Sequence, residues 1–159
     1  MFYDWLKLSV CLFFNLLNKL TGNKLPPFGC ACALVEQDGL YLVVELPRKR
    51  VVFPGGFMTW KERPAQTAER EGREETGLQL RAGELVTVYA TPSPRLTRMS
   101  TICFVYTARV IGGELHKTTE GRPSWLNESE LRRQLTPEYL QMFDDYLHWR
   151  QQSTTASQP

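Results

Sequence analysis

The sequence GGFMTWKERPAQTAEREGREETGL, from Gly55 to Leu78, decides how the rest of the chain is organised. From Pro64 onward its composition favours a helix. Proline suits the first position of a helix, and Gly77 suits the left-handed position just beyond the last turn. The stretch therefore predicts a glycine-containing turn followed by a helix between these two residues.

Three glutamates gather near the end of this predicted helix. Glu71 is followed by Glu74 and Glu75, and positions three and four apart lie on one helical face. Each like-charge pair at this spacing destabilises a helix by about 0.2–0.5 kcal/mol, and the negative end of the helix dipole adds to the repulsion. Either Arg70 and Arg73 pair with the carboxylates on a solvated face, or a hard divalent cation such as Mg²⁺ or Mn²⁺ binds them.

The wider spacing favours the cation. The stretch resembles the signature of the Nudix hydrolases, G-x5-E-x7-R-E-U-x-E-E-x-G-U, in which U is a bulky aliphatic residue. The matching residues are Gly56, Glu62, Arg70, Glu71, Glu74, Glu75, Gly77 and Leu78. Gly72 departs from the pattern, because the family usually has an aliphatic side chain there that packs under the helix. Glycine at this position also costs a helix about 1 kcal/mol relative to alanine.

The resemblance implies both a fold and a chemistry. The expected fold class is α/β (α+β), with a mixed β-sheet sandwiched between helices, and the strand-rich halves around one central helix independently favour α+β. The implied activity is Mg²⁺-dependent cleavage, with Mn²⁺ as a substitute, of a pyrophosphate bond in a nucleoside diphosphate linked to X. A substrate of the ADP-ribose or nucleotide-sugar type is therefore expected.

The resemblance also implies a set of metal ligands. Glu74 and Glu75 are the expected main ligands, Glu71 completes the shell, and Gly55 belongs to the same metal site. Glu74 is counted among the catalytic residues as well. We expect the cation to offset the repulsion between these carboxylates and the substrate phosphates.

Two further catalytic roles carry over from the family. Arg70 is expected to pair with Glu62 and to fix the loop onto the helix. Many Nudix enzymes have another glutamate in the loop before a Trp-containing strand, and Glu120-Gly121, just upstream of Trp125, resembles that arrangement. Either Glu120 or a glutamate of the signature is expected to accept the proton of the attacking water. The alternative for Glu120 is an exposed loop carboxylate.

Two basic loops offer arginines to the substrate phosphates. Arg48 and Arg50 lie directly before the glycine turn, and Arg95 lies with Arg98 in the proline-containing loop 90–100. Guanidinium groups suit phosphate because they bind it in bidentate geometry. The alternative in both places is a solvated loop without a ligand.

Length and charge limit the remaining possibilities. A chain of 159 residues is one domain long and can bury a core, and a net charge of +2 does not favour nucleic acid as the main partner. We expect an N-terminal helix in 1–22, the hydrolase domain in 23–152 and a flexible tail in 153–159. The cysteines at 11, 30, 32 and 103 are expected to be free thiols rather than part of a metal site.

The N-terminal segment is strongly apolar, yet polar side chains recur in it every three or four positions. They are Asp4, Lys7, Cys11, Asn15 and Asn18. This pattern predicts an amphipathic helix over residues 2–20. The longest clean apolar run, 8–14, is too short to span a membrane, and no secretory cleavage site follows it. We therefore expect a cytoplasmic protein. The helix packs on its own domain, on a second subunit of a homodimer, or in a membrane interface, which would make the protein peripheral.

The remaining elements follow from residue type and alternation. Residues 28–46 predict two strands joined at Asp38-Gly39, and further strands are expected over 51–53, 80–89, 101–111 and around Trp125. Residues 137–150 predict an amphipathic C-terminal helix.

Three alternative functions stay open. The first is house-cleaning hydrolysis of modified nucleoside triphosphates, because the signature recognises diphosphate and metal while other loops recognise the rest of the substrate. The second is a non-catalytic Nudix-fold protein that binds nucleotides. The third is a membrane-surface protein whose N-terminal helix carries the main function.

Overall fold

The computed structural model describes residues 2–47, 49–93, 95–119 and 121–156, and the side chains of residues 8–155 within those ranges, that of Thr154 excepted. The helices are α1 (Phe2–Leu20), α2 (Pro64–Thr76), α3 (Glu128–Gln134) and α4 (Pro137–Ala156). The strands are β1 (Phe28–Gln37), β2 (Leu40–Leu46), β3 (Arg50–Val52), β4 (Gly55–Phe57), β5 (Leu78–Thr91), β6 (Thr101–Gly113) and β7 (Arg122–Asn127).

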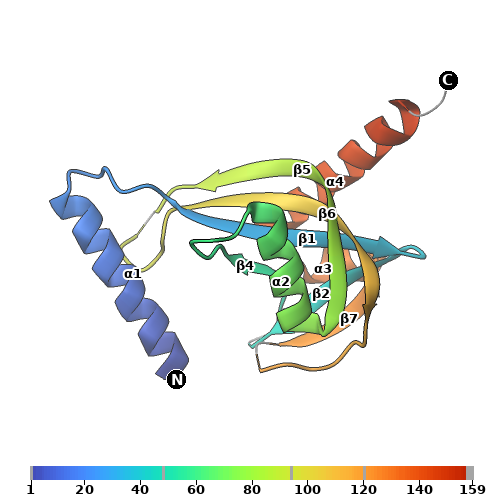
Figure 1. The fold of residues 1–159 in the computed structure, drawn as a ribbon, viewed down its shortest axis with the longest axis horizontal. Coiled ribbons are helices and arrows are strands. Elements are labelled where there is room, and N and C mark those ends of the chain that lie inside the picture. Colours follow the sequence, from blue (N-terminus) through green and yellow to red (C-terminus); the bar gives the residue numbers. More distant parts are fainter. Residues whose placement is uncertain (1, 48, 94, 120, 157–159) are drawn as a thin grey trace.

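The strands form a mixed sheet. In the described residues it has seven strands in the order β3-β2-β1-β6-β5, with β4 also pairing with β1 and β7 with β2. β1 and β6 run parallel and the other pairs run antiparallel. Helix α2 lies across the sheet in Figure 1, and α3 and α4 lie behind it. The expected fold, a mixed sheet sandwiched between helices, is confirmed.

The β1–β2 hairpin closes where the sequence predicted it. Gln37 pairs with Leu40, and the two residues between them, Asp38 and Gly39, have φ angles of 53° and 75°. Two consecutive left-handed residues match the right-handed twist of the flanking strands. Asp-Gly is one of the few dipeptides that adopts this turn readily.

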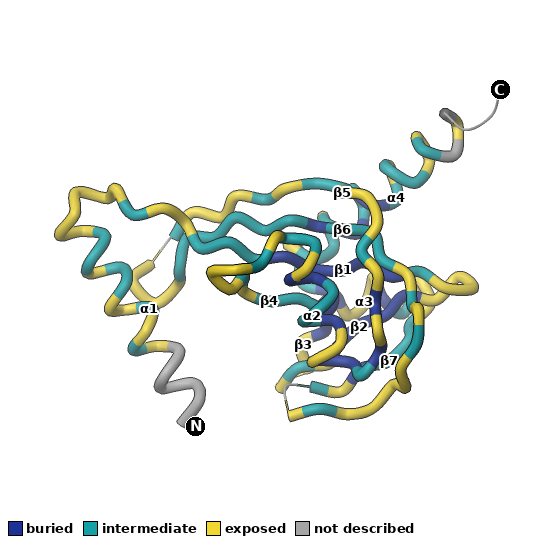
Figure 2. Tube along the Cα trace, viewed as in Figure 1, coloured by how far each residue is buried: buried dark blue, intermediate teal, exposed yellow. Residues whose placement is uncertain are grey.

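Two cores separate the helices from the sheet. On one side, Ala68 of α2 packs with Ala31 and Leu80 of the sheet, and all three are at most 4% exposed. On the other side, Phe143 of α4 packs with Phe53 and the residues around it. Helices α2 and α4 therefore each bury one face against the sheet, and Figure 2 shows buried and more exposed stretches alternating along α2. Of the charged residues of α2, Glu75 alone is buried, and the others are intermediate or exposed.

Three local features differ from the sequence prediction. Gly55 and Gly56 belong to a short strand that pairs with Cys32 and Ala31, and not only to a turn. Helix α3 was not predicted, although Asn127 caps it and Glu130 closes a capping box, a pattern readable from the sequence. The C-terminal helix also continues to Ala156. Its extra turns replace part of the expected tail.

Helix α1 forms as predicted but lies beside the sandwich, at one end of the molecule (Figure 1). Its described part contains no fully buried residue. Phe14 contacts Phe28 of β1 edge to face at 4.8 Å between ring centroids, and Phe28 lies 6.2 Å from Phe57 of β4. No helix in the described residues is long and apolar enough to cross a membrane. The four cysteines of the sequence are free thiols, as expected.

Candidate active site

Helix α2 is fixed at both ends by the residues that predicted it. Pro64 occupies its first turn, and the backbone N–H of Arg63 donates to the side chain of Gln66 at 2.9 Å. At the other end Gly77 has a φ of 80° and donates to the carbonyl oxygen of Arg73 at 2.9 Å. A left-handed residue satisfies the last carbonyls of a helix, and glycine adopts that conformation without strain.

Arg70 lies at the centre of the acidic face of α2. Its Nε donates to Glu62 Oε1 at 2.6 Å, and its Nη2 donates to Glu62 Oε2 at 3.2 Å and to the carbonyl oxygen of Phe57 at 3.0 Å. Its Nη1 lies 2.8 Å from Glu71 Oε1 and donates to Glu74 Oε2 at 2.9 Å. One guanidinium therefore holds three carboxylates and ties α2 to the end of β4. The predicted pair of Glu62 and Arg70 forms.

Glu62 is fully engaged in this network. Besides Arg70, its carboxylate accepts from the Thr67 hydroxyl at 3.0 Å and from the Thr59 backbone N–H at 3.2 Å. These bonds, with that from Arg70 the strongest, lower the pKa of Glu62 to about 2. The same pair raises the pKa of Arg70. The two threonines were missed from the sequence, although Thr67 is an unusual polar residue on the inward face of α2.

The glycines of β4 bring the backbone against two of the box carboxylates. Glu75 is only 5% exposed, and its Oε2 accepts from the backbone N–H of Gly55 at 2.8 Å. A Cβ atom on Gly55 would stand 2.5 Å from the backbone carbonyl oxygen of Ala31, which is too close for any side chain, and a Cβ on Gly56 would stand 2.4 Å from Glu71 Oε1, so that carboxylate would have to move. Gly55 is therefore needed where β4 pairs with β1, and its N–H lies against the Glu75 carboxylate.

Gly72 has a structural explanation of its own. It is buried on the inward face of α2, and a Cβ there would stand 2.3 Å from Leu80 Cδ1 of β5. The space that an aliphatic side chain at position 72 would fill is thus occupied from the strand. The departure from the signature changes which element supplies the packing and leaves the glutamates in place.

The loop that precedes β7 runs along the C-terminal end of α2. The backbone N–H of His116 donates to the carbonyl oxygen of Thr76 at 3.1 Å, and the Thr118 hydroxyl donates to that of Glu75 at 3.4 Å. Glu120, the predicted proton acceptor, lies outside the described residues. Gly121 lies against Val44 and the backbone of Glu45.

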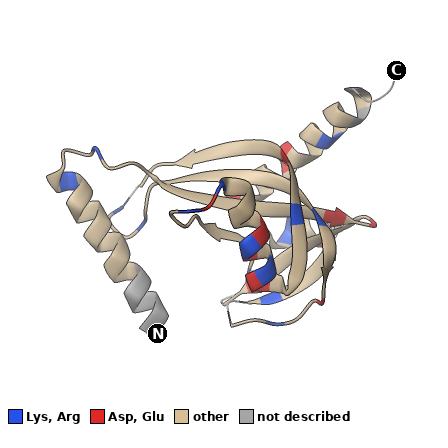
Figure 3. Cartoon of the chain, in the orientation of Figure 1, with Lys and Arg blue, Asp and Glu red and all other residues tan. Residues whose placement is uncertain are grey.

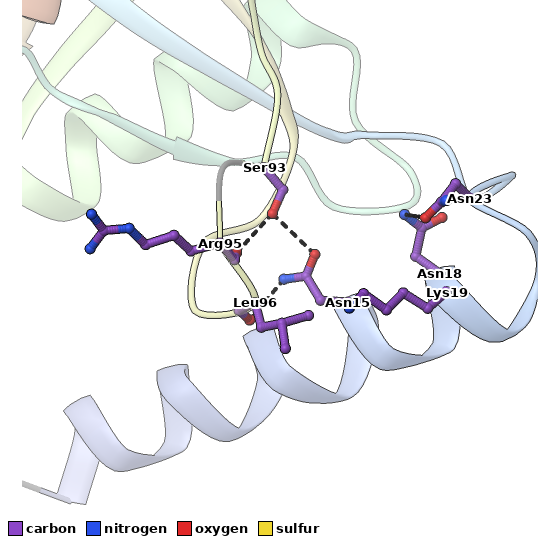
Figure 4. A pocket seen from close by; sticks show the side chains of 7 residues that line it. All are labelled: Asn15, Asn18, Lys19, Asn23, Ser93, Arg95 and Leu96. Atoms are coloured by element: carbon purple, nitrogen blue, oxygen red, sulfur yellow. Dashed lines mark hydrogen bonds between the residues drawn. The ribbon is translucent and has the colours of Figure 1, made fainter.

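The arginines predicted to bind phosphate are Arg48, Arg50 and Arg95, and the two that the structure describes lie on different elements. Arg48 lies outside the described residues. Arg50 is the first residue of β3, and its charge acts on Tyr139 of α4. Burial raises the pKa of Tyr139, and the charge of Arg50 partly opposes that rise. Arg95 lies in the loop against α1, where it lines a pocket with Asn15 (Figure 4). Arg50 therefore interacts with α4 and Arg95 lies beside α1, and these interactions do not involve α2.

The carboxylates suit a divalent cation as a donor set. Glu71, Glu74 and Glu75 offer hard oxygen ligands from one face, and Arg70 shows that a positive charge is accommodated between Glu71 and Glu74. Within the described residues, no three side chains of His, Cys, Asp or Glu already converge on one point. Mg²⁺ is commonly held by one or two carboxylates with waters and substrate phosphates, so a complete protein cage is not required.

Comparison with known proteins decides the family. The family model of the NUDIX domain matches residues 26–146, which include the whole sheet, α2 and α3. This chain belongs to the Nudix hydrolase family. It is a pyrophosphohydrolase of that family, and the resemblance read from the Gly55–Leu78 stretch, the Nudix box, is confirmed.

Individual relatives agree with this assignment. An ADP-ribose pyrophosphatase of Methanocaldococcus jannaschii is 29% identical over 123 residues, which cover 74% of this chain and 71% of that protein. A NUDIX hydrolase of Nitrosomonas europaea has a TM-score of 0.70 and 26% identity, over 77% of this chain and 90% of that one. A bifunctional NMN adenylyltransferase/ADP ribose pyrophosphatase of Francisella tularensis, complexed with AMP and a Mn ion, has a TM-score of 0.69 and 20% identity, over 89% and 47%. The last likeness concerns the fold.

Proposed function

We propose that this Nudix hydrolase cleaves the pyrophosphate bond of a nucleoside diphosphate linked to X, of the ADP-ribose or nucleotide-sugar type, with Mg²⁺ as cofactor. The observation that carries the proposal is the gathering of the box carboxylates beside the glycine strand β4, with Arg70 bound to Glu71 and Glu74 and Gly55 bound to Glu75. The substrate type is supported by the Methanocaldococcus jannaschii relative.

The metal ligands of the proposal are Glu71, Glu74 and Glu75, in the site that also contains Gly55. When bound, a divalent cation would neutralise the substrate phosphates and lower the pKa of a bound water. Glu74 is the most accessible of the three glutamates. Its side chain is 48% exposed and that of Glu71 is 12% exposed, while Glu75 is buried. Glu74 can therefore exchange Arg70 for another cation with little rearrangement.

Arg70 and Glu62 act as positioning residues. Glu62 accepts hydrogen bonds from Nε and Nη2 of Arg70, so that Nη1 is directed at Glu71 and Glu74. Since an arginine fork is planar and rigid, fixing one edge orients the other. The pair therefore sets where the carboxylates meet the substrate.

The proton of the attacking water goes to a carboxylate. We assign this role to Glu120 or to a glutamate of the box. The loop around position 120 is tethered to the helix end that carries Glu75, since Thr118 donates to the carbonyl oxygen of that residue. This tether supports Glu120 over a carboxylate elsewhere on the surface.

Substrate and metal are tested together by a release assay. The full chain is offered ADP-ribose, nucleotide sugars, dinucleoside polyphosphates and nucleoside triphosphates, with Mg²⁺, with Mn²⁺ or with chelator, and nucleoside monophosphate or phosphate is measured. We expect metal-dependent release from ADP-ribose or a nucleotide sugar. Preference for triphosphates would replace the proposed substrate by the house-cleaning alternative, and silence of folded, metal-binding protein would favour the non-catalytic binder.

The same assay decides the role of the basic loops. Arg48, Arg50 and Arg95 are proposed phosphate contacts, and replacing each by glutamine is expected to raise KM for the preferred substrate. The matched control is Arg133→Gln, which removes an exposed arginine of α3. An arginine whose loss leaves KM at the control value does not bind substrate.

A further inference from the structure

The outward face of α1 is apolar. Its well exposed large side chains are Leu8, Leu12, Phe13, Leu16 and Leu20, with exposed fractions of 41%, 42%, 62%, 58% and 77%. Positions 12, 16 and 20 follow one another along one side of a helix, and Phe13 widens the stripe. A single exposed leucine is ordinary, whereas a continuous stripe marks a contact surface.

The polar face of α1 points towards the protein instead. Asn15 Nδ2 donates to the carbonyl oxygens of Leu96 and Arg98 at 2.9 Å each, and Asn15 Oδ1 accepts from the Ser93 hydroxyl at 3.1 Å (Figure 4). A surface helix normally buries its apolar side and exposes its polar side. Here hydrogen bonds to loop carbonyls fix the opposite orientation, so the apolar stripe is directed into solvent.

Cations without acidic neighbours in sequence lie on α1, just after it, and in the loop that binds Asn15. The exposed ones are Lys19, Lys24, Arg95 and Arg98. The sequence has no Asp or Glu in 8–35 or in 85–113, the segments that form the described side chains of α1 and the strands and loop beside it. In Figure 3 the acidic residues, coloured red, lie on α2 and on other parts of the sandwich. A pocket of about 280 Å³ between α1 and the loop is lined by both Lys19 and Arg95.

We propose that α1 and residues 95–98 of the loop beside it form a docking surface for an anionic membrane. The apolar stripe enters the boundary between headgroups and acyl chains, and Lys19, Lys24 and Arg98 contact the lipid phosphates. An amphipathic helix that lies in a membrane interface has just these two components, apolar area and attraction to anionic lipid. Each lysine or arginine near such a surface contributes about 1 kcal/mol, which is about a fivefold change in partitioning.

Charge disfavours a second copy of the chain as the occupant. In a two-fold symmetric contact the same patch meets itself, so each partner brings the same cations. Segments 8–35 and 85–113 contain no carboxylate that could pair with them, and Asp4 is the one acidic residue in the sequence of α1. An anionic lipid surface covers the stripe and neutralises the cations together.

The test is sedimentation of the full chain with phosphatidylcholine vesicles, with and without phosphatidylglycerol. We expect binding to the anionic vesicles, weakened by salt. Leu16→Asp is expected to lower the partition coefficient at least about tenfold, the equivalent of losing one buried leucine. Lys19→Gln combined with Lys24→Gln is expected to lower it about 25-fold, at about fivefold per lysine.

Matched controls separate these effects from general changes in the protein. Leu85→Asp alters an apolar residue of β5 that is 45% exposed, and Arg133→Gln removes an exposed cation of α3. Both are expected to leave partitioning unchanged. Because the altered side chains of α1 face solvent, circular dichroism should show intact folding.

Two results would overturn the proposal. The first is equal sedimentation of wild type and Leu16→Asp with anionic vesicles. The second is a dimer in vesicle-free solution that Leu16→Asp dissociates, without vesicle binding by the wild type, because the stripe would then be covered by a second copy. Analytical ultracentrifugation of both proteins distinguishes these cases.

Discussion

Helices α1 and α2 differ in the kind of side chain that each directs into solvent. α2 packs its small inward residues, Ala68 and Gly72, against the sheet and buries Glu75 beside them, while Glu74 points outward, where Arg70 binds it together with Glu71. α1 turns Asn15 inward to loop carbonyls and leaves Leu16 and its neighbours in solvent. Apolar packing positions α2, and hydrogen bonds position α1.

This difference shows what an amphipathic pattern can establish. Alternation of apolar and polar side chains defines two faces of a helix, but it does not say which face meets the protein. For α2 the sheet offers a large apolar surface, and burial decides. For α1 the neighbouring surface is a loop that presents the carbonyl groups of Leu96 and Arg98, to which an asparagine side chain can donate and a leucine cannot.

The largest effect is expected on the outward face of α2. Glu74→Gln should lower kcat by about 10³-fold, since it removes one charged ligand from the metal site. The thermal midpoint should stay close to that of the wild type, because the Glu74 side chain is 48% exposed. Glu69→Gln on the same helix, whose carboxylate bonds to the backbone of Ala82, is the control for activity. Normal Mg²⁺-dependent turnover of Glu74→Gln would refute its role as a ligand.

Arg70 should affect both stability and activity. Arg70→Met leaves Glu62, Glu71 and Glu74 without their shared cation, and we expect a loss of about 2–3 kcal/mol in the free energy of unfolding. Urea titration measures this loss, and the release assay measures the accompanying fall in activity. Arg73→Met, which removes an exposed arginine of α2, is the control. Unchanged stability of Arg70→Met would mean that the guanidinium is not a brace.

The packing between the inward face of α2 and β5 can be tested with a larger side chain at position 72. Gly72→Val should destabilise the fold by about 2 kcal/mol, because the new side chain meets Leu80 Cδ1 in a packed core. Leu80→Ala makes room, so the double variant should be more stable than the sum of the two single changes. Additive effects in thermal unfolding would show that the two positions do not share one volume.

Acid should weaken the contact between α2 and its preceding loop. The pKa of Glu62 is lowered from 4.5 to about 2, so its contribution to stability is complete above pH 4.5 and is lost as the pH falls to about 2. Glu62→Gln should therefore flatten the fall in stability over this interval, and at neutral pH it should cost about 1–2 kcal/mol. Guanidinium chloride unfolding at several pH values measures both. A slope identical to that of the wild type would contradict the assignment, and Glu84→Gln, at an exposed site, serves as the control.

The smallest effect is expected for the attachment of α1. Asn15→Ala removes the bonds to Leu96 and Arg98 and should cost about 1 kcal/mol, confined to α1 and its loop. Amide hydrogen exchange should quicken there, while the sheet keeps its protection. Thr21→Ala, whose hydroxyl bonds to carbonyls of its own helix, is the control. Unchanged exchange in α1 would mean that packing of Phe14 on Phe28 holds the helix.

Much of the fold and part of the site could be predicted from the sequence. The hairpin at Asp38-Gly39, the helix between Pro64 and Gly77, and the pair of Glu62 with Arg70 depend on local spacing, and all three form. The strand character of Gly55 was not predictable, because it arises from pairing with Cys32 of a distant strand.

Other parts of the site depend on contacts that spacing does not encode. Arg95 was expected near phosphate and lies in the loop against α1, since Asn15 binds that loop by its carbonyls. Thr67 bonds to Glu62 because the start of α2 folds back over the loop. The orientation of α1 likewise follows from the surface it meets. The residues assigned to phosphate binding and to metal binding in the candidate active site stay predictions for the experiments above.

Gly72 and Leu80 have a consequence for how this protein can evolve. Since one volume serves both positions, a mutation at either is tolerated only in the context of the other. Relatives with an aliphatic residue at the position of Gly72 are therefore expected to carry a smaller residue opposite it, and the two sites should covary in an alignment. In this chain, Leu80 of the strand fills the volume that an aliphatic side chain of the helix would otherwise occupy, and the glutamates of the Nudix box keep their places.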